Sequence, residues 1–319
     1  MNGLARSPPF ARFRLPGARG AIELYREDGL AGLARRAGRR SLDVIVTSPP
    51  YNLDQPYTAY RDRKPRGEYL GWIRDLAGAV DESLSSRGSF FLNVGSPPRD
   101  PWFAWDVARE VGKALVLQNV LHWVKSIAIE RRFVGRGAGL DRDVALGHYR
   151  PLGSSRYVHG AHEYIFHFTR DGNVPIDRLA LGVAYQDPSN ERRWGSGRGR
   201  LRCRGNTWFL PYATIQRRSR DRPHPASFPP ELAEWCVRLH GRARVRRWAD
   251  PFVGIGSSAV AAVRIGRAFL GFDIDETYLA VARDRVRAAL ARGGEGFSSS
   301  RDPGRSPRAA GSTRVSHAS

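Results

Sequence analysis

A short apolar run that stops at two consecutive prolines is the feature of this chain that most constrains its fold. Residues 44–52 read Val-Ile-Val-Thr-Ser-Pro-Pro-Tyr-Asn, and an apolar run of this kind is typical of a buried strand. Proline cannot donate to a strand ladder and restricts the residue before it, so the strand must end at Thr47. The two prolines therefore restrict the backbone where the chain leaves the edge of the sheet. The chain presents there a hydroxyl group (Ser48), backbone carbonyls and an aromatic ring (Tyr51).

Apolar spacing along the rest of the chain alternates between the periods of strands and helices. Strands are predicted at residues 42–47, 89–94, 114–124, 246–250 and 268–272. Helices are predicted at residues 68–85, 102–111, 232–239, 257–265 and 276–290. Strands that alternate with helices predict an α/β fold, in which one sheet carries helices on both faces.

The chain is predicted to consist of one long domain between two loose ends. Residues 1–19 are expected to form a loose basic arm, and residues 293–319, rich in Ser, Arg, Pro and Gly, a disordered tail. Residues 20–292 are expected to form the α/β domain. Within it, residues 126–220 break the alternation with arginine, glycine and aromatic residues, apart from a strand at 163–169. A loop of that length is uncommon inside a compact domain, so we expect an inserted segment with a basic, aromatic surface.

A glycine-containing loop marks a second candidate site. Residues 250–258 read Asp-Pro-Phe-Val-Gly-Ile-Gly-Ser-Ser, between a predicted strand and a predicted helix. Glycines at such a turn let the backbone approach a ligand closely, and the start of the helix offers free amide donors. Asp273 ends the next predicted strand, where an acid can accept hydrogen bonds from both ribose hydroxyls of a nucleoside. A nucleoside-type cofactor and a simple packing turn are the two interpretations of this loop.

The balance of charge favours a polyanionic partner. The formal net charge is +21, which suggests nucleic acid. Lysine stands only at positions 64, 113 and 125, so arginine supplies the rest of the 52 basic residues. A GC-rich coding sequence would produce the same excess of arginine regardless of function, so charge alone does not decide the partner.

The sequence does not indicate a membrane segment, a disulfide framework or a metal site. There is no apolar run long enough to cross a bilayer and no signal-peptide pattern, so a cytoplasmic protein without membrane contact is expected. Cys203 and Cys236 form neither a disulfide framework nor a zinc-ligand spacing. His159, His162 and His167 are spaced irregularly for one face of a strand, so no metal site is expected.

The two motifs together resemble those of S-adenosylmethionine-dependent DNA amino-methyltransferases. The Ser-Pro-Pro-Tyr motif at residues 48–51 precedes the glycine loop at 250–258. This order is similar to that of the permuted β class, whose target-recognition segment lies between the motifs. Further matching stretches are Trp-Val-Lys at 123–125, Arg-Cys-Arg-Gly-Asn-Thr-Trp at 202–208 and His-Pro-Ala-Ser-Phe-Pro at 224–229. The resemblance implies a Rossmann-like sheet with circularly permuted motif order.

The resemblance also implies site residues. Catalytic roles fall on Ser48, Pro49, Pro50 and Tyr51. Cofactor-binding roles fall on Asp28, Asp250, Pro251, Phe252, Gly254, Gly256, Ser257, Asp273, His224 and Pro225. At Asp28 the preceding glycine of the family is replaced by Glu27, so helix capping is an equally good interpretation of this residue.

The chemistry implied by the resemblance is transfer of a methyl group to an exocyclic amine. Such an amine is a poor nucleophile because its lone pair is delocalised into the ring. The Ser48 hydroxyl and the Pro49 carbonyl would accept hydrogen bonds from its two N–H groups and so favour a localised lone pair on the nitrogen. Tyr51 would stack on the flipped base. Family members with serine before Pro-Pro-Tyr mostly modify cytosine N4 and those with aspartate mostly adenine N6, so cytosine is favoured and adenine is the alternative. Trp123 could wall the base pocket.

Double-stranded DNA is the expected partner, with the inserted segment as the reader of sequence. Contacts with phosphates or with guanine edges are expected from Lys125, Arg131, Arg132, Arg192, Arg193, Arg198 and Arg200. A restriction endonuclease could accompany the enzyme, or it could act alone. The rival from another class is a non-catalytic nucleic-acid-binding protein on the same scaffold, which would bind duplex DNA without binding the cofactor.

Overall fold

The computed structural model describes residues 7–15, 20–134, 140–147, 153–187, 189–194, 200–211 and 227–294. Within these ranges one nine-stranded sheet has the strand order β1-β2-β13-β12-β3-β4-β8-β5-β11. Its strands are β1 (Ala11–Arg14), β2 (Ala21–Arg26), β13 (Ala268–Asp273), β12 (Arg247–Asp250), β3 (Leu42–Thr47), β4 (Leu84–Val94), β8 (His162–Thr169), β5 (Val116–Val124) and β11 (Thr207–Phe209). The neighbouring strands β2, β13, β12, β3 and β4 run parallel to one another. β8 is antiparallel to both of its neighbours, β4 and β5.

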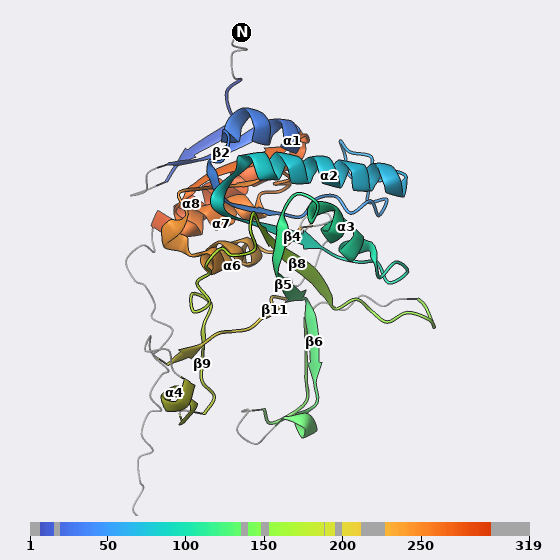
Figure 1. The fold of residues 1–319 in the computed structure, drawn as a ribbon, viewed down its shortest axis with the longest axis vertical. Helices are drawn as coiled ribbons and strands as arrows, with labels where there is room; N and C mark the ends of the chain where they lie inside the picture. Colours follow the sequence, from blue (N-terminus) through green and yellow to red (C-terminus); the bar gives the residue numbers. More distant parts are fainter. Residues whose placement is uncertain are drawn as a thin grey trace, which may run out of the picture.

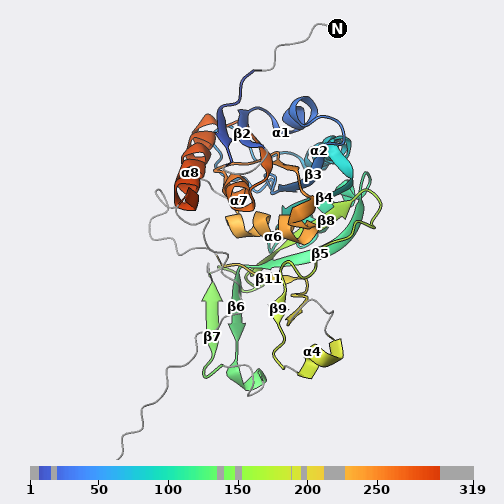
Figure 2. The same cartoon turned by 90° about the vertical axis from the view of Figure 1, so that its left-hand side faces the viewer.

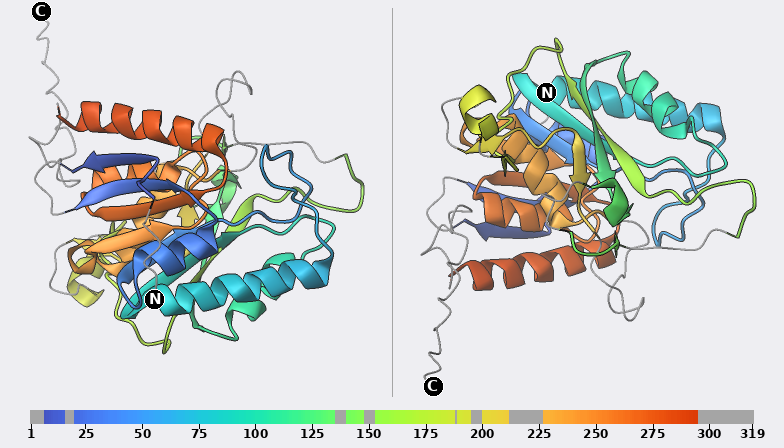
Figure 3. Two further views of the ribbon diagram at one scale, coloured as in Figure 1. Left: turned by 90° about the horizontal axis from the view of Figure 1, so that it is seen from above. Right: turned by 90° about the horizontal axis from the view of Figure 1, so that it is seen from below.

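Helices cover the sheet on both faces, as Figure 3 shows from above. One face carries α1 (Gly29–Gly32), α2 (Arg66–Ser83) and α3 (Phe103–Val111). The other carries α6 (Pro230–His240), α7 (Ser257–Ile265) and α8 (Glu276–Gly294). The predicted α/β class is confirmed, and the ten predicted strands and helices outside the inserted segment all appear close to their expected bounds.

The central strand β3 explains why the sheet needs two helical layers. All six of its residues are buried. Because side chains alternate across a strand, Val44 and Val46 join the core on one face with Trp248, while Ile45 joins the core on the other face with Phe90. Full burial of each aliphatic side chain stabilises the fold by about 1.5–3 kcal/mol. A strand whose side chains are buried on both faces belongs in the middle of such a sheet.

The connections from β12 and β3 lead to opposite sides of the sheet, so the strand order reverses between these two strands. These strands are parallel neighbours, with Trp248 opposite Val44 and Ala249 opposite Ile45. From β12 the chain passes through α7 to β13 on one side, and from β3 it passes through α2 to β4 on the other. Loops that diverge from neighbouring strands leave a crevice at the carboxyl ends of the strands. Both sequence motifs lie at this crevice, because they follow β3 and β12 directly.

The predicted loose arm is wrong for part of its length. Residues 11–14 form β1, which pairs antiparallel with β2, and Arg12 lies 3.1 Å from Glu23 across the pair. The edge of the sheet supplies hydrogen bonds that the sequence pattern did not reveal. At the other end, α8 continues to residue 294, so the predicted tail starts within the last turn of a helix. Residues 295–319 lie outside the described ranges.

The predicted insertion at 126–220 is not one continuous segment. β8 and β11 both return to the central sheet, where they flank β5. The chain makes one excursion between β5 and β8 and another between β8 and β11, both seen below the sheet in Figures 1 and 2. The first is a ribbon of β6 (Ser126–Ile129) and β7 (Val144–Gly147), with a short 3-10 turn at Arg131–Phe133. The second contains β9 (Val183–Ala184), α4 (Ser189–Trp194) and β10 (Leu201–Arg202).

Candidate active site

The ends of β3 and β12 are joined by a buried hydrogen bond. The Thr47 hydroxyl donates to Asp250 Oδ1 at 2.6 Å, and both side chains are buried. Ser48, the next residue, lines two cavities at once. One is an aromatic cavity that extends to Asp273, and the other is a small cavity beside the glycine loop, lined by Phe252, Gly254 and Ser257 among others. The fold therefore brings the Ser-Pro-Pro-Tyr motif and the glycine loop to one place.

The first cavity has aromatic walls and acidic residues. Its aromatic side chains are Tyr57, Tyr60, Trp72, Phe252 and Tyr278. Its acidic residues are Asp28, Asp273 and Asp275. Flat faces hold a planar ring system by stacking, and carboxylates accept hydrogen bonds from hydroxyl or amino groups. A ligand with a heterocycle and vicinal hydroxyls, such as a nucleoside, matches this lining.

Asp250 organises the glycine loop from within. One carboxylate oxygen accepts from Thr47 and from the Phe252 amide at 3.0 Å, and the other accepts from Ser258 at 2.5 Å. Burial raises the pKa of Asp250 to about 6, against the opposing effect of these donors. Asp250 was predicted as a cofactor residue, and the structure places it on the wall of the small cavity with its oxygens already engaged by the protein.

Gly256 cannot carry a side chain in this loop. Its φ is +83°, and a Cβ there would lie 2.7 Å from Cβ of Ala282 on α8. The glycine therefore lets α7 begin directly against α8, with Ser257 buried at the first position of the helix.

Asp273 lies where β13 ends, as predicted. Its Oδ2 accepts from the Gly254 amide at 2.9 Å, and its Oδ1 accepts from the Asp275 amide at 2.8 Å. Burial raises the pKa of Asp273 to about 6. The carboxylate thus connects the glycine loop to the aromatic cavity, which it also lines.

Asp28 caps a helix and also borders the aromatic cavity. Its side chain caps α1 by accepting from the Leu30 and Ala31 amides at 3.1 and 3.0 Å, and it also lines the aromatic cavity. Gly29 beside it allows a close approach, because a Cβ at that position would lie 2.2 Å from the carbonyl oxygen of Pro251. The start of α1 is thereby pressed against the Asp-Pro-Phe turn.

The segment that follows Tyr51 folds over the aromatic cavity around one buried acid. Asp62, which is 2% exposed, accepts from the amides of Asn52, Leu53 and Gln55. The Asn52 side chain makes two hydrogen bonds to the backbone of Lys64, at 2.6 and 2.8 Å. Asn52 and Asp54 both have positive φ, at 57° and 56°. Strained backbone held in this way is common at functional sites.

Behind Ser48 lies a cluster of polar side chains from four segments. Ser48 Oγ is 2.7 Å from the Tyr51 hydroxyl. The Tyr51 hydroxyl is within hydrogen-bond distance of Asn93 on β4 and of Glu163 on β8. Lys125 Nζ lies 2.9 Å from Glu163 Oε1. Lys125 was predicted to contact DNA, but its ammonium is instead paired inside this cluster and its side chain is only 20% exposed.

The two prolines of the motif differ in their surroundings. Pro49 is buried, whereas Pro50 lines the aromatic cavity. The Pro50 carbonyl accepts from the Tyr69 hydroxyl at 2.8 Å, which fixes the turn against α2. The suggestion that Trp123 walls a base pocket is wrong. Trp123 is fully buried in the core on one face of the sheet and donates to the Leu210 carbonyl at 2.8 Å, just after β11, which pairs with β5.

The remaining predicted residues are distributed as follows. Pro251, Phe252, Gly254 and Ser257 line the two cavities. Arg131, Arg132, Arg192, Arg193 and Arg200 are exposed on the two excursions below the sheet. His224, Pro225 and Arg198 lie outside the described residues. Among the described residues no group of His, Cys, Asp or Glu side chains is arranged to hold a metal ion, and no helix is long and apolar enough to span a bilayer.

Several site residues escaped the sequence reasoning. Tyr57, Tyr60 and Tyr278 looked like scattered aromatics, although their clustering just after the Pro-Pro-Tyr and Asp-Ile-Asp motifs was a usable signal. Asn93 and Glu163 each lie one residue from the end of a strand that contains a run of buried residues. A polar residue at the end of a buried strand was the sign that would have revealed both.

Comparison with known proteins gives a consistent result. The sequence family described as DNA methylase matches residues 42–284. The type II methyltransferase M.ScaI of Streptomyces caespitosus is 27% identical over 278 residues, which are 84% of this chain and 82% of that protein. The type II methyltransferase M.SmaI of Serratia marcescens is 22% identical over 272 residues, or 76% of this chain and 84% of that protein.

Solved structures show the same fold. The PvuII DNA methyltransferase, described as cytosine-N4-specific, aligns with a TM-score of 0.56 at 16% identity, over 88% of this chain and 96% of its own. A protein of Thermus thermophilus in complex with S-adenosyl-L-methionine, described as a candidate DNA modification methylase, aligns with a TM-score of 0.54 at 20% identity, over 84% of this chain and 94% of its own.

Proposed function

This chain belongs to the DNA methylase family, and from that membership we propose that it methylates the N4 amine of a cytosine flipped out of double-stranded DNA. S-adenosylmethionine is its cofactor. When bound, the cofactor supplies an activated methyl group on a sulfonium, which is a good leaving group. The protein must therefore place the amine and the methyl group in line, and remove one proton.

The residues of the aromatic cavity fit the nucleoside part of this cofactor. The flat walls formed by Tyr57, Tyr60 and Trp72 suit the adenine ring. Asp273 would accept hydrogen bonds from the ribose hydroxyls, since an ionised carboxylate has more acceptor sites than the two backbone amides occupy. Phe252 and Gly254 border the small cavity, where the methionine end would lie.

The observation that carries the proposal is the position of Ser48. Its side chain borders both the aromatic cavity and the small cavity of the glycine loop. An amine that donates a hydrogen bond to Ser48 Oγ would therefore lie beside the methionine end of the cofactor. Positioning of this kind supplies much of the rate enhancement in a transfer between two bound reactants.

Cytosine is favoured over adenine because serine occupies the position before Pro-Pro-Tyr. A hydroxyl is neutral and can both accept and donate, whereas aspartate at that position is typical of adenine N6 enzymes. Either base presents an exocyclic amine, so the same pocket chemistry serves both. Adenine N6 methylation is accordingly the alternative outcome of the experiment below.

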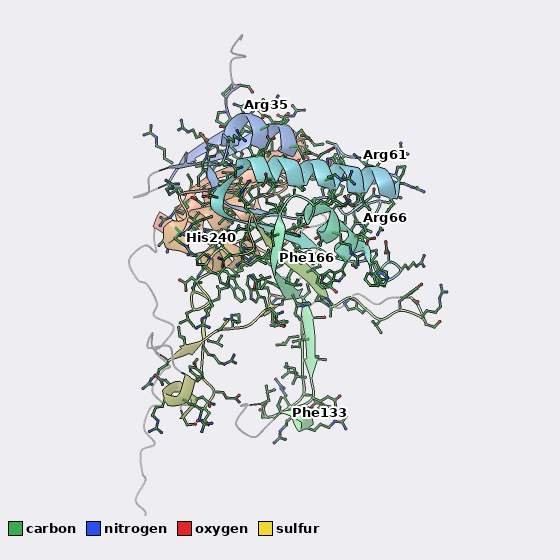
Figure 4. All side chains as sticks on the ribbon, viewed as in Figure 1. Arg35, Arg61, Arg66, Phe133, Phe166 and His240 are labelled. Atoms are coloured by element: carbon green, nitrogen blue, oxygen red, sulfur yellow. The ribbon has the colours of Figure 1, made fainter. Side chains whose placement is uncertain are left out.

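Exposed arginines are proposed to hold the DNA. Arg131 and Arg132 lie at the end of the β6–β7 ribbon, and Arg192 and Arg193 lie on α4. Both excursions project from the same side of the sheet, and Figure 4 labels Phe133 at the far end of the ribbon. The ribbon begins at Lys125, which contacts the cluster behind Ser48. DNA bound along these excursions would thus reach the catalytic crevice.

The test is the identity of the methylated base. DNA from cells that express the chain is digested to nucleosides, which mass spectrometry identifies, and the same DNA is sequenced for modified positions. N4-methylcytosine at a defined sequence is the expected result. N6-methyladenine would move the assignment to adenine. If neither nucleoside appears and the purified protein binds duplex DNA but no S-adenosylmethionine, the non-catalytic alternative is correct.

A further inference from the structure

Glu163 lies on β8, outside both motifs, yet its carboxylate organises the hydrogen bonds behind Ser48. Its Oε2 is 3.0 Å from the Tyr51 hydroxyl and 2.7 Å from Asn93 Nδ2, and its Oε1 is 2.9 Å from Lys125 Nζ. The side chain is 14% exposed. Gly95, just after β4, makes room for it, because a Cβ there would lie 2.9 Å from Cγ of Glu163.

The ionised carboxylate fixes the orientation of the Asn93 amide. A carboxylate only accepts hydrogen bonds, so the Asn93 atom 2.7 Å from Glu163 must be the NH₂ group. The same NH₂ group is 2.8 Å from the Tyr51 oxygen, to which it donates. The Asn93 Oδ1 atom is buried with no hydrogen-bond partner among the described residues. That cost is consistent with an orientation imposed by Glu163.

The carboxylate also decides the direction of the Ser48–Tyr51 hydrogen bond. The phenol has one proton, and besides Ser48 Oγ at 2.7 Å its acceptors include Glu163 Oε2 at 3.0 Å and the backbone carbonyl of Asn93 at 3.1 Å. The charged acceptor forms the stronger bond. In the 2.7 Å contact with Ser48 the phenol oxygen must then accept, and Ser48 must donate. A serine that donates to Tyr51 presents lone pairs, and no proton, to the cavity.

We propose that Glu163 is a positioning residue that makes Ser48 a hydrogen-bond acceptor and takes up the proton released by methyl transfer. The inference rests on the proposed function. As the amine nitrogen forms its bond to the methyl carbon, the carbon–sulfur bond breaks and its electron pair stays on sulfur. The nitrogen then has a positive charge and one proton in excess. That proton passes to Ser48 Oγ, the Ser48 proton passes to the Tyr51 oxygen, and the Tyr51 proton passes to Glu163.

This transfer leaves a neutral methylated amine and a protonated Glu163. No further reactant is needed, because the Ser48 and Tyr51 oxygens each gain one proton as they lose another, and Glu163 keeps the proton that it receives. Lys125 holds the second carboxylate oxygen, so Oε2 faces Tyr51. The pairing explains why the lysine after β5 lies inside the protein instead of on its DNA-binding surface.

The test compares Glu163→Gln with Glu82→Gln, a change at an exposed position on α2. Glutamine keeps the size of the side chain but cannot take up the proton. We expect kcat to fall about 10²-fold, with KM for DNA and for S-adenosylmethionine within twofold of wild type. A folded Glu163→Gln protein with kcat within twofold of wild type would overturn the proposal.

A double-mutant cycle shows whether Glu163 acts through Tyr51. If it does, Glu163→Gln should cost almost nothing further in a Tyr51→Phe background, because the relay is already broken. Losses that multiply would contradict the proposal. Should Glu163→Gln fail to fold, Glu163→Asp takes its place in the same cycle. If the wild-type protein methylates DNA and the Glu163→Gln variant is fully active, this inference is refuted while the proposed function stands.

Discussion

Two aspartates at the ends of neighbouring strands, the buried Asp250 and the partly buried Asp273, have raised pKa values for the same reason but serve different parts of the site. Asp250 accepts from Thr47, Ser258 and the Phe252 amide, so its carboxylate holds the glycine loop together. Asp273 accepts only backbone amides in the hydrogen bonds of the loop, and it borders the aromatic cavity. Asp273 is therefore the acid whose loss should weaken ligand binding most directly.

Asp273→Asn is expected to weaken S-adenosylmethionine binding about 10–100-fold, equivalent to about 1.4–2.8 kcal/mol, since an amide replaces a charged acceptor. Asp54→Asn, at an exposed position, is the matched control. Titration calorimetry measures both affinities. An Asp273→Asn protein that binds as tightly as wild type would show that this acid does not contact the cofactor.

The affinity should also depend on pH in a definite direction. Burial raises the pKa of Asp273 to about 6, and only the ionised form accepts hydrogen bonds at both oxygens. Affinity is therefore expected to be constant above pH 7 and to decrease as pH falls through 6, at most tenfold per pH unit for one group. The decrease should be smaller in Asp273→Asn. An affinity that rises as the pH falls would contradict this assignment.

At the scale of elements, one buried hydroxyl joins β4, β8 and α6. Ser89 Oγ lies 2.9 Å from His167 Nε2 and 2.9 Å from His240 Nδ1. Burial lowers the pKa of His167 to about 3 and that of His240 to about 4. Both imidazoles are therefore neutral at pH 7, and each depends on the serine for a hydrogen bond inside the core.

Ser89→Ala is expected to lower the free energy of unfolding by about 2–4 kcal/mol, because two buried ring nitrogens lose a partner. Ser86→Ala, at an exposed position on the same strand, should change it by less than about 0.5 kcal/mol. Urea denaturation at pH 7 measures both. Equal stability of the two variants would mean that the histidines find other partners.

The β6–β7 ribbon carries the clearest prediction for DNA binding. Changing Arg131 and Arg132 to alanine removes two exposed cations at its end. DNA affinity should fall, and the slope of log K against log salt should decrease by about 2 if both contact phosphates. The kcat at saturating DNA should stay within twofold of wild type. Filter binding at several salt concentrations measures the slope.

The control for the ribbon is the adjacent pair Arg39 and Arg40, which is exposed just before the amino end of β3. Changing these two residues to alanine should leave the salt slope unchanged. If the two double variants lose DNA affinity equally, binding is spread over the whole basic surface and the ribbon has no special part in it.

Over the whole molecule, periodicity and motifs predicted the parts that bury apolar residues in regular patterns. β3, α7 and β13 were found close to their predicted bounds because each is a continuous apolar run next to a turn signal. β1 and β11 were missed because short edge strands form only by hydrogen bonding to a neighbouring strand. In β1, for example, Arg12 pairs with Glu23 of β2. The local sequence does not indicate which strand will be that neighbour.

The candidate site was predictable where chemistry sits in a motif and not where it comes from distant strands. Ser48, Tyr51 and Asp273 stand beside strong local signals, and the structure places them around one crevice. Glu163 reaches this crevice only because β8 inserts antiparallel between β4 and β5. That placement depends on sheet topology, which the residue spacing of the chain does not encode. The pairing of Lys125 with Glu163 depends on the same placement of β8.

The central claim is that Ser48 accepts the target amine beside the methyl donor. Its most direct test is single-turnover methyl transfer from labelled S-adenosylmethionine to modification-free DNA, for Ser48→Ala and for Ser96→Ala. Ser96 starts the other Ser-Pro-Pro sequence that follows a strand, but its hydroxyl bonds only to the backbone around α3 in the described structure. We predict that Ser48→Ala slows transfer at least about 10²-fold while both ligands still bind, and that Ser96→Ala stays within about threefold of wild type. Transfer at the wild-type rate by Ser48→Ala would contradict the account.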